Sequence, residues 1–124
     1  MFRKAIVPAI LMFGLTVGVA HADSFGTLYD DATEHSTKGN AYLEDSHTQY
    51  LLGNRPESCE ALERARVHFE AGYRDVEAIR ALVESDGDLE GHSASEVMDW
   101  VTTQEQLAGQ LGEQMQGYWQ EHCQ

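Results

Sequence analysis

Residues 54–83 read NRPESCEALERARVHFEAGYRDVEAIRALV and carry the strongest helical pattern of the chain. Asn54, Pro56 and Glu57 are typical of a helix start, with an N-cap residue, a proline in the first turn and a glutamate at the capping-box position. Apolar or small side chains then recur every three or four positions, which places them on one helix face. This stripe consists of Cys59, Leu62, Ala65, Phe69, Gly72, Tyr73, Val76, Ile79 and Val83. The pattern predicts one long amphipathic helix.

The two segments that flank this helix show the same period. In residues 24–53 the repeating face is made of unusually small side chains, and Gly39-Asn40 is a pair that can break a helix. This segment is therefore predicted as either one continuous helix or two shorter pieces. In residues 93–124, Ser93 and Glu96 have capping-box spacing and open a third helix. No run alternates with a period of two, so no strands are predicted.

These elements predict an all-α fold with residues 23–124 as a single helical domain. Helices of about 30 residues are each about 45 Å long, and matched lengths favour an up-down-up three-helix bundle. In that topology Cys59 and Cys123 lie at the same end of the bundle, because one begins the second helix and the other ends the third. We therefore expect a disulfide that closes a loop of about 65 residues. Free thiols or a metal pair are the alternatives.

The first 22 residues have the order of a cleaved secretory signal peptide. Arg3 and Lys4 precede an apolar run over residues 5–20, and Ala20-His21-Ala22 supplies the small residues that a signal peptidase reads. The apolar run is too short for a stable membrane-spanning helix, and the residue directly after the cleavage position is Asp23 and not a cysteine, which argues against a lipoprotein. The sequence thus predicts a periplasmic or secreted protein with no stable membrane insertion after cleavage.

The chain is strongly acidic, with 8 Lys and Arg against 21 Asp and Glu and a formal charge of −13. Loss of Arg3 and Lys4 with the signal peptide would give 6 − 21 = −15. Such a charge argues against nucleic acid and anionic membrane as partners. It is compatible with a cationic protein or peptide, with divalent cations, or simply with solubility. Residues 93–124 carry five acids and no Lys or Arg, whereas five of the six remaining basic residues lie in residues 54–83.

The turn before the third helix offers a candidate calcium site. Residues 86–91 read Asp-Gly-Asp-Leu-Glu-Gly and resemble the first half of an EF-hand loop, with Asp86, Asp88 and Glu90 at the first three ligand positions. The match stops there, because the position of the bidentate glutamate is occupied by Val97. The alternative reading is an acidic inter-helix turn in which glycines supply positive φ angles.

Other chemistry receives little support from the sequence. Asp31 with His35 and Glu44 with His47 have spacings that put two donors on one helix face. Two donors do not make a transition-metal site, so a third would have to come from another helix. His68 lies near the apolar stripe, where packing is its expected role. No catalytic motif is present, so we expect a non-catalytic protein that needs no cofactor.

The leading functional hypothesis is therefore binding. An exported, acidic helical protein fits an inhibitor, immunity or adaptor-like role in which it contacts a cationic protein or peptide. Calcium binding at the acidic turn is the alternative.

Overall fold

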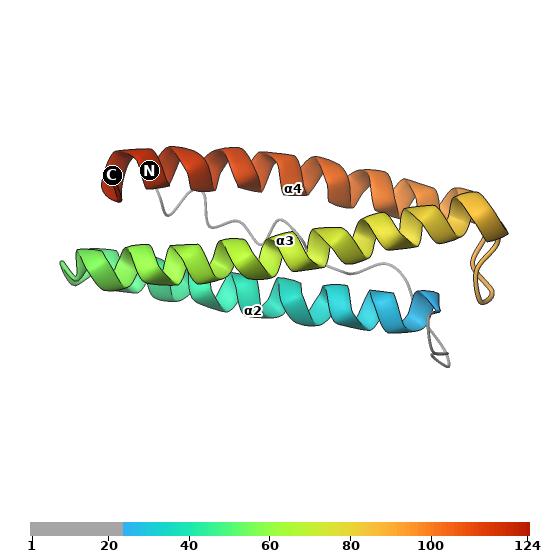
Figure 1. The fold of residues 1–124 in the computed structure, drawn as a ribbon, viewed down its shortest axis with the longest axis horizontal. Helices are drawn as coiled ribbons and strands as arrows, with labels where there is room; N and C mark the ends of the chain where they lie inside the picture. The colour runs from blue at the N-terminus through green and yellow to red at the C-terminus, as the bar shows by residue number, and fades with distance from the viewer. Residues whose placement is uncertain (1–23) are drawn as a thin grey trace.

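The computed structural model describes residues 24–124, which form three antiparallel helices side by side (Figure 1). Helix α2 spans Phe25–Leu51, α3 spans Arg55–Asp86 and α4 spans Ala94–His122. The predicted all-α, up-down-up bundle with its disulfide is confirmed. The predicted signal peptide lies outside the described residues, and the single-domain assignment stays a prediction.

Helices α2 and α3 approach each other closely along their length. Small side chains allow this approach, since a short side chain brings two helix backbones nearer than a leucine does. Those buried at this contact are Ala32, Ser36, Gly39 and Ser46 on α2 and Ser58, Ala65 and Gly72 on α3. The two helices therefore form a tight hairpin.

Gly39 does not break α2, which is continuous through Gly39-Asn40. Its missing side chain instead makes room for the ring of Phe69 on α3. A Cβ atom at position 39 would lie only 2.7 Å from Phe69 Cε1. Gly39 thus forms a notch on α2 for the Phe69 side chain, and α2 stays helical on both sides of it.

Helix α4 packs with much larger side chains. Val97, Val101 and Leu111 are fully or almost fully buried against the hairpin. Aromatic rings connect α4 to α2, with centroids 5.4 Å apart for Tyr29 and Trp100. Because these contacts are made by long side chains, α4 does not approach its neighbours as closely as α2 and α3 approach each other.

Of the two predicted helix caps, the one at Ser93 is confirmed and the one at Asn54 is not. Ser93 caps α4, because its side chain accepts a hydrogen bond from the backbone N–H of Glu96 at 3.1 Å. The Glu96 carboxylate lies 3.0 Å from His92 Nδ1. Asn54 precedes α3 as predicted but makes no side-chain cap, and its amide nitrogen donates to Gln49 Oε1 at 2.7 Å.

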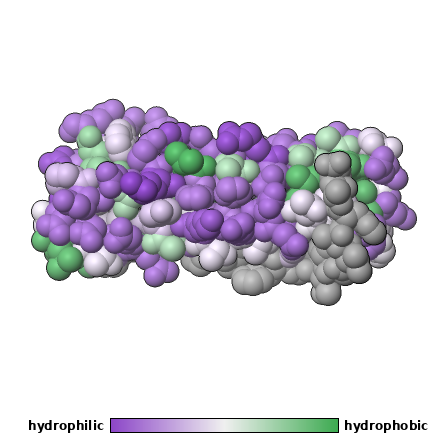
Figure 2. All heavy atoms as spheres, turned by 60° about the horizontal axis from the view of Figure 1, so that its bottom comes forward, coloured by the Kyte–Doolittle hydropathy of each residue, from purple (hydrophilic) through white to green (hydrophobic). Residues whose placement is uncertain are grey.

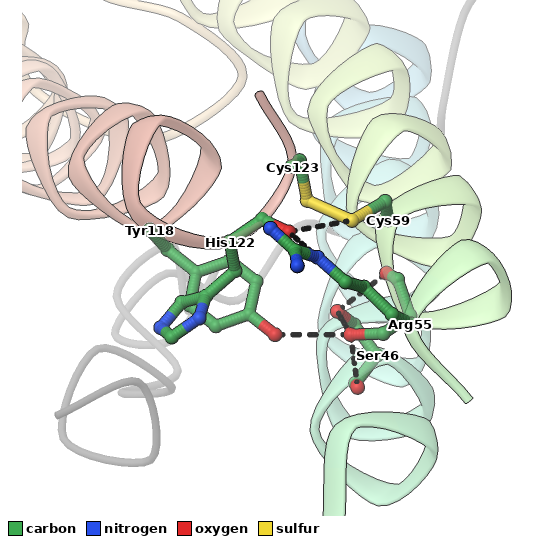
Figure 3. Close-up of a disulfide and its surroundings, with 7 residues drawn as sticks. Ser46, Arg55, Cys59, Tyr118, His122 and Cys123 are labelled. Carbon is green, nitrogen blue, oxygen red and sulfur yellow. Dashed lines mark hydrogen bonds between the residues drawn. A yellow bond between two sulfur atoms is a disulfide. The ribbon is translucent and has the colours of Figure 1, made fainter. Parts of the chain in front are cut away.

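The disulfide joins the start of α3 to the end of α4, as predicted (Figure 3). The Cα atoms of Cys59 and Cys123 are 5.8 Å apart, within the usual range for a disulfide. Arg55 reinforces this end of the bundle, because its guanidinium donates a hydrogen bond to the backbone carbonyl of His122.

A buried hydroxyl network lies beside the disulfide and connects all three helices (Figure 3). Ser46 Oγ donates to the Ser58 carbonyl at 2.7 Å, and Ser58 Oγ donates to the Ser46 carbonyl at 2.8 Å. Since Ser58 has then used its one proton, Tyr118 Oη is the donor in the 3.0 Å contact with Ser58 Oγ. Burial raises the pKa of Tyr118, which keeps this phenol protonated as the network requires.

Removal of the disulfide should lower stability strongly. For a Cys59→Ser/Cys123→Ser variant we expect a loss of about 4 kcal/mol in the free energy of unfolding, because the open chain regains the entropy of a loop of about 65 residues. Urea denaturation measures this loss, and wild type unfolded with a thiol reductant is the control. Two free thiols in protein purified without reductant, or equal stability of the two forms, would contradict the expectation.

A methyl group at position 39 should also destabilise the fold. Gly39→Ala gains about 1 kcal/mol of helix propensity but forces the Phe69 ring to move, and overpacking of this kind costs about 1–3 kcal/mol. We expect a net loss in urea denaturation that a second change, Phe69→Leu, partly restores. Gly117→Ala is the matched control, since its Cβ would meet nothing within 4 Å. Equal stabilisation by both alanines would show that the notch is unimportant.

Candidate functional site

A solvent-accessible groove of about 900 Å³ runs between α3 and α4. Residues of α3 from Leu62 to Arg74 line one wall, and residues of α4 from Glu105 to Trp119 line the other. The helices are antiparallel, so the Trp119 end of the groove is nearest the disulfide.

The floor of the groove is apolar. Leu62, Phe69, Leu111 and Met115 are buried beneath it, while Tyr73 is 38 % exposed at its surface. On α4, Gly109 and Gly112 line the groove and are exposed, and a Cβ added at either would meet nothing within 4 Å. The α4 wall is therefore open helix backbone over this stretch.

The α3 rim combines charges of both signs. Arg66 lies between Glu63 and Glu70 and pairs with both, at 2.5 Å from the Glu70 carboxylate. The hydrogen bond from Arg66 holds the pKa of Glu63 below its usual value. Arg74 is the second guanidinium of this rim. The α3 rim is thus formally neutral.

The α4 rim is purely acidic. Its charged residues are Glu105 and Glu113, and no Lys or Arg of α4 stands against them. Glu113 is exposed, whereas Glu105 is half-buried. Counted over both rims, the groove has four carboxylates and two guanidinium groups.

Arg80 lies at the far end of the groove and forms ion pairs with Glu105 and, at 3.8 Å, with Glu84, while Glu77 contacts Glu105. Arg80 of α3 makes a two-pronged contact with Glu105, at 2.9 Å from Nε to Oε2 and 2.5 Å from Nη2 to Oε1. This contact lowers the pKa of Glu105. The neighbouring Glu77 has a raised pKa because it shares a hydrogen bond with Glu105 and is partly buried. Burial and the charges of these two carboxyl groups also raise the pKa of Tyr73.

The three acids of the predicted calcium turn face three different groups. Glu90 accepts a hydrogen bond from the N–H of Gly26 at 3.0 Å, and Asp88 accepts one from the N–H of Ala94 at 2.8 Å. Asp86 accepts from its neighbour Ser85 at 2.5 Å. Within residues 24–124, no group of three or more His, Cys, Asp or Glu is arranged to hold a metal ion.

These contacts give the acidic turn a structural role that the sequence analysis missed. Ser24 makes no side-chain cap at the start of α2. The Glu90 carboxylate instead accepts from the N–H of Gly26 in the first turn, where the helix dipole favours negative charge. Gly87 and Gly91 have the positive φ angles expected of turn glycines. Calcium binding stays a prediction, and the ion would compete with two helix starts for its ligands.

The Asp31–His35 and Glu44–His47 donor pairs noted in the sequence lie on α2, which does not line the groove. His35 on α2 lies opposite His68 on α3, with their Nδ1 atoms 3.2 Å apart. His68 also stacks on Tyr42, in agreement with a packing role. Burial and the nearby His35 lower the pKa of His68, so the neutral imidazole is favoured in the folded protein.

No protein-family model, curated protein or solved structure matches this chain. Among the helices of residues 24–124, none is both long and apolar enough to cross a membrane. Hydrophilic residues predominate on the face of the molecule shown in Figure 2, and the hydrophobic ones form small separate areas. Since no comparison identifies a site, the α3–α4 groove is the candidate site because of its size and its apolar floor.

Glu77→Gln should raise stability at pH 7, because it removes a negative charge beside Glu105 and keeps a side-chain N–H that can donate to the Glu105 carboxylate. The folded state raises the pKa of Glu77 and so favours its protonated form, which makes the ionised group destabilising above that pKa. The gain should disappear as the pH falls below about 4, where both folded and unfolded states are protonated. Urea denaturation of variant and wild type at a series of pH values measures the difference.

Glu105→Gln is the matched control for this prediction. It should lower stability at pH 7, because Arg80 then loses its two-pronged carboxylate partner. Two variants of the same sign at pH 7 would contradict the assignment of different roles to the two glutamates.

Proposed function

We propose that this protein is a non-catalytic binding protein whose α3–α4 groove takes a segment of a cationic protein or peptide. The observation that carries the proposal is an apolar floor combined with a net excess of two carboxylates over guanidinium groups on the rims of one groove. Such a site rewards a ligand that brings apolar side chains together with positive charge.

The charge of the whole chain supports the same partner class. The formal charge of −13, or −15 without Arg3 and Lys4, creates a field that attracts cations over the entire surface. Long-range attraction of this kind speeds encounter, while the groove would supply specificity through apolar contact. An inhibitor, immunity or adaptor-like role in the periplasm or outside the cell fits this behaviour.

A non-catalytic role is part of the proposal. The carboxyl pair of Glu77 and Glu105 is the most unusual acid–base feature near the groove. Arg80 holds Glu105 ionised, and Glu77 does not line the groove. The pair is therefore better explained as part of the contact between α3 and α4 than as a general acid and base.

The proposal can be tested with a synthetic peptide of leucine and lysine, about 14 residues long to match the groove. Titration is followed by the fluorescence of Trp119, which lines the groove and is half-buried. We expect the lysine peptide to bind with an affinity that falls as salt is added, and a counterpart with glutamate in place of lysine not to bind. Equal binding of both peptides, or of neither, would contradict the proposal.

Matched charge variants separate the groove from the general acidity of the protein. Glu70→Gln/Glu113→Gln removes one carboxylate from each rim, and Asp30→Asn/Glu44→Gln removes two exposed carboxylates from α2. We expect the dissociation constant of the lysine peptide to rise about tenfold for the rim variant only. An equal loss in both variants would show that net charge, without the groove, explains the binding.

A further inference from the structure

We infer that the occupant of the α3–α4 groove is an amphipathic helix, which packs against Gly109 and Gly112 of α4 as the fourth helix of the bundle. This inference rests on the proposed function and names the form of its ligand. The expected ligand has an apolar stripe flanked by lysine or arginine.

The unfilled glycines are the first observation. Glycines at the α2–α3 contact are used for packing: a Cβ at Gly39 would strike Phe69, and one at Gly72 would lie 3.4 Å from His35 Cβ. Gly109 and Gly112 line a groove but have nothing within 4 Å of an added Cβ. Glycine in a helix interior costs about 1 kcal/mol relative to alanine, and here no contact within the described chain offsets that loss.

The shape of the groove is the second observation. Its walls run from Leu62 to Arg74 and from Glu105 to Trp119, which at 1.5 Å per residue is about 20 Å. A helix of that length has about 13 residues. Because both walls are helices, their backbone N–H and C=O groups are already paired and offer no edge to an extended peptide. A helical ligand satisfies its own backbone, and glycines let its backbone approach closely.

Charge is the third observation, and it selects the partner. Glu63 and Glu70 stand two turns apart on the α3 rim, and Glu105 and Glu113 stand about as far apart on the α4 rim. The two rims together carry four carboxylates against the guanidinium groups of Arg66 and Arg74, so a ligand with lysine or arginine beside its apolar stripe is favoured over an acidic one. The α4 helix of a second copy would bring five further acids from residues 93–124 and no Lys or Arg, so self-association is opposed by repulsion.

The test compares two peptides of identical leucine and lysine content. Both have two further residues at the centre, which are alanine in the peptide patterned as an amphipathic helix and proline in the other, where they prevent the helix. The three proteins are wild type, Gly109→Ala/Gly112→Ala, and the control Gly117→Ala, whose glycine lies on α4 outside the groove lining. Binding is measured by calorimetry, and helix formation in the peptide by circular dichroism.

We expect the helical peptide to gain helicity on binding to wild type and to Gly117→Ala with equal affinity. The proline peptide should bind at least about tenfold more weakly. In Gly109→Ala/Gly112→Ala the two methyl groups occupy the ligand's approach, and the dissociation constant should rise about tenfold or more. Gly109→Ala/Gly112→Ala and Gly117→Ala should both have a melting temperature about 5 °C higher per replaced glycine, so weaker binding by either would not reflect unfolding.

The outcomes distinguish this inference from the proposed function. If the proline peptide binds as well as the helical one and the glycine variants bind normally, the groove takes extended cationic chains and the helix inference is wrong. If wild type binds neither peptide, the proposed function itself is wrong. If wild type forms a dimer that Gly109→Ala/Gly112→Ala abolishes, a second copy is the occupant and the inference is overturned.

Discussion

The close contact between α2 and α3 is the constraint on which the rest of the structure depends. Small residues such as Ala32 and Ser46 let the two backbones approach, and Phe69 fills the notch at Gly39. Helix α4 packs onto this hairpin through large side chains and stands farther off. The groove lies between α3 and α4, the more widely separated pair. It stays open there because Gly109 and Gly112 of α4 have no side chains to fill it.

The disulfide and several polar contacts fix both ends of the bundle, and the Arg80–Glu105 ion pair joins α3 to α4 between them. At one end, the disulfide and the buried hydroxyl network of Ser46, Ser58 and Tyr118 tie the three helices together. At the other end, Glu90 and Asp88 of the turn bind the N–H groups at the starts of α2 and α4. The middle of the bundle is held by its apolar core, to which the groove-floor residues Leu62, Phe69, Leu111 and Met115 belong.

Much of the fold could be predicted from the sequence, because helical period, capping residues and cysteine positions are local or nearly local signals. The stripe of residues 54–83, the cap at Ser93 and the Cys59–Cys123 bond were all predicted in this way. The sequence left the continuity of α2 open, since glycine weakens a helix. The reason for a glycine at position 39 is the ring of Phe69, which lies on another helix and cannot be found from the local sequence.

The candidate site was harder to predict. The groove depends on which glycines of α4 face a neighbour and which face solvent, and a period of 3.6 residues does not determine the neighbour. Likewise, Glu90 contacts Gly26 across 64 positions, so the sequence suggested a calcium ligand where the fold places a helix cap. The acidity of the third helix was visible in the sequence and supports the proposed partner.

The position of the disulfide has one more consequence, which concerns proteolysis. The bond encloses α3, the turn and α4 in a single covalent ring, and most of residues 87–93 in the turn are exposed. A protease that cuts this turn opens the ring without separating its halves, because Cys59 and Cys123 still join them at the opposite end. The two walls of the groove would therefore remain one molecule after such a nick.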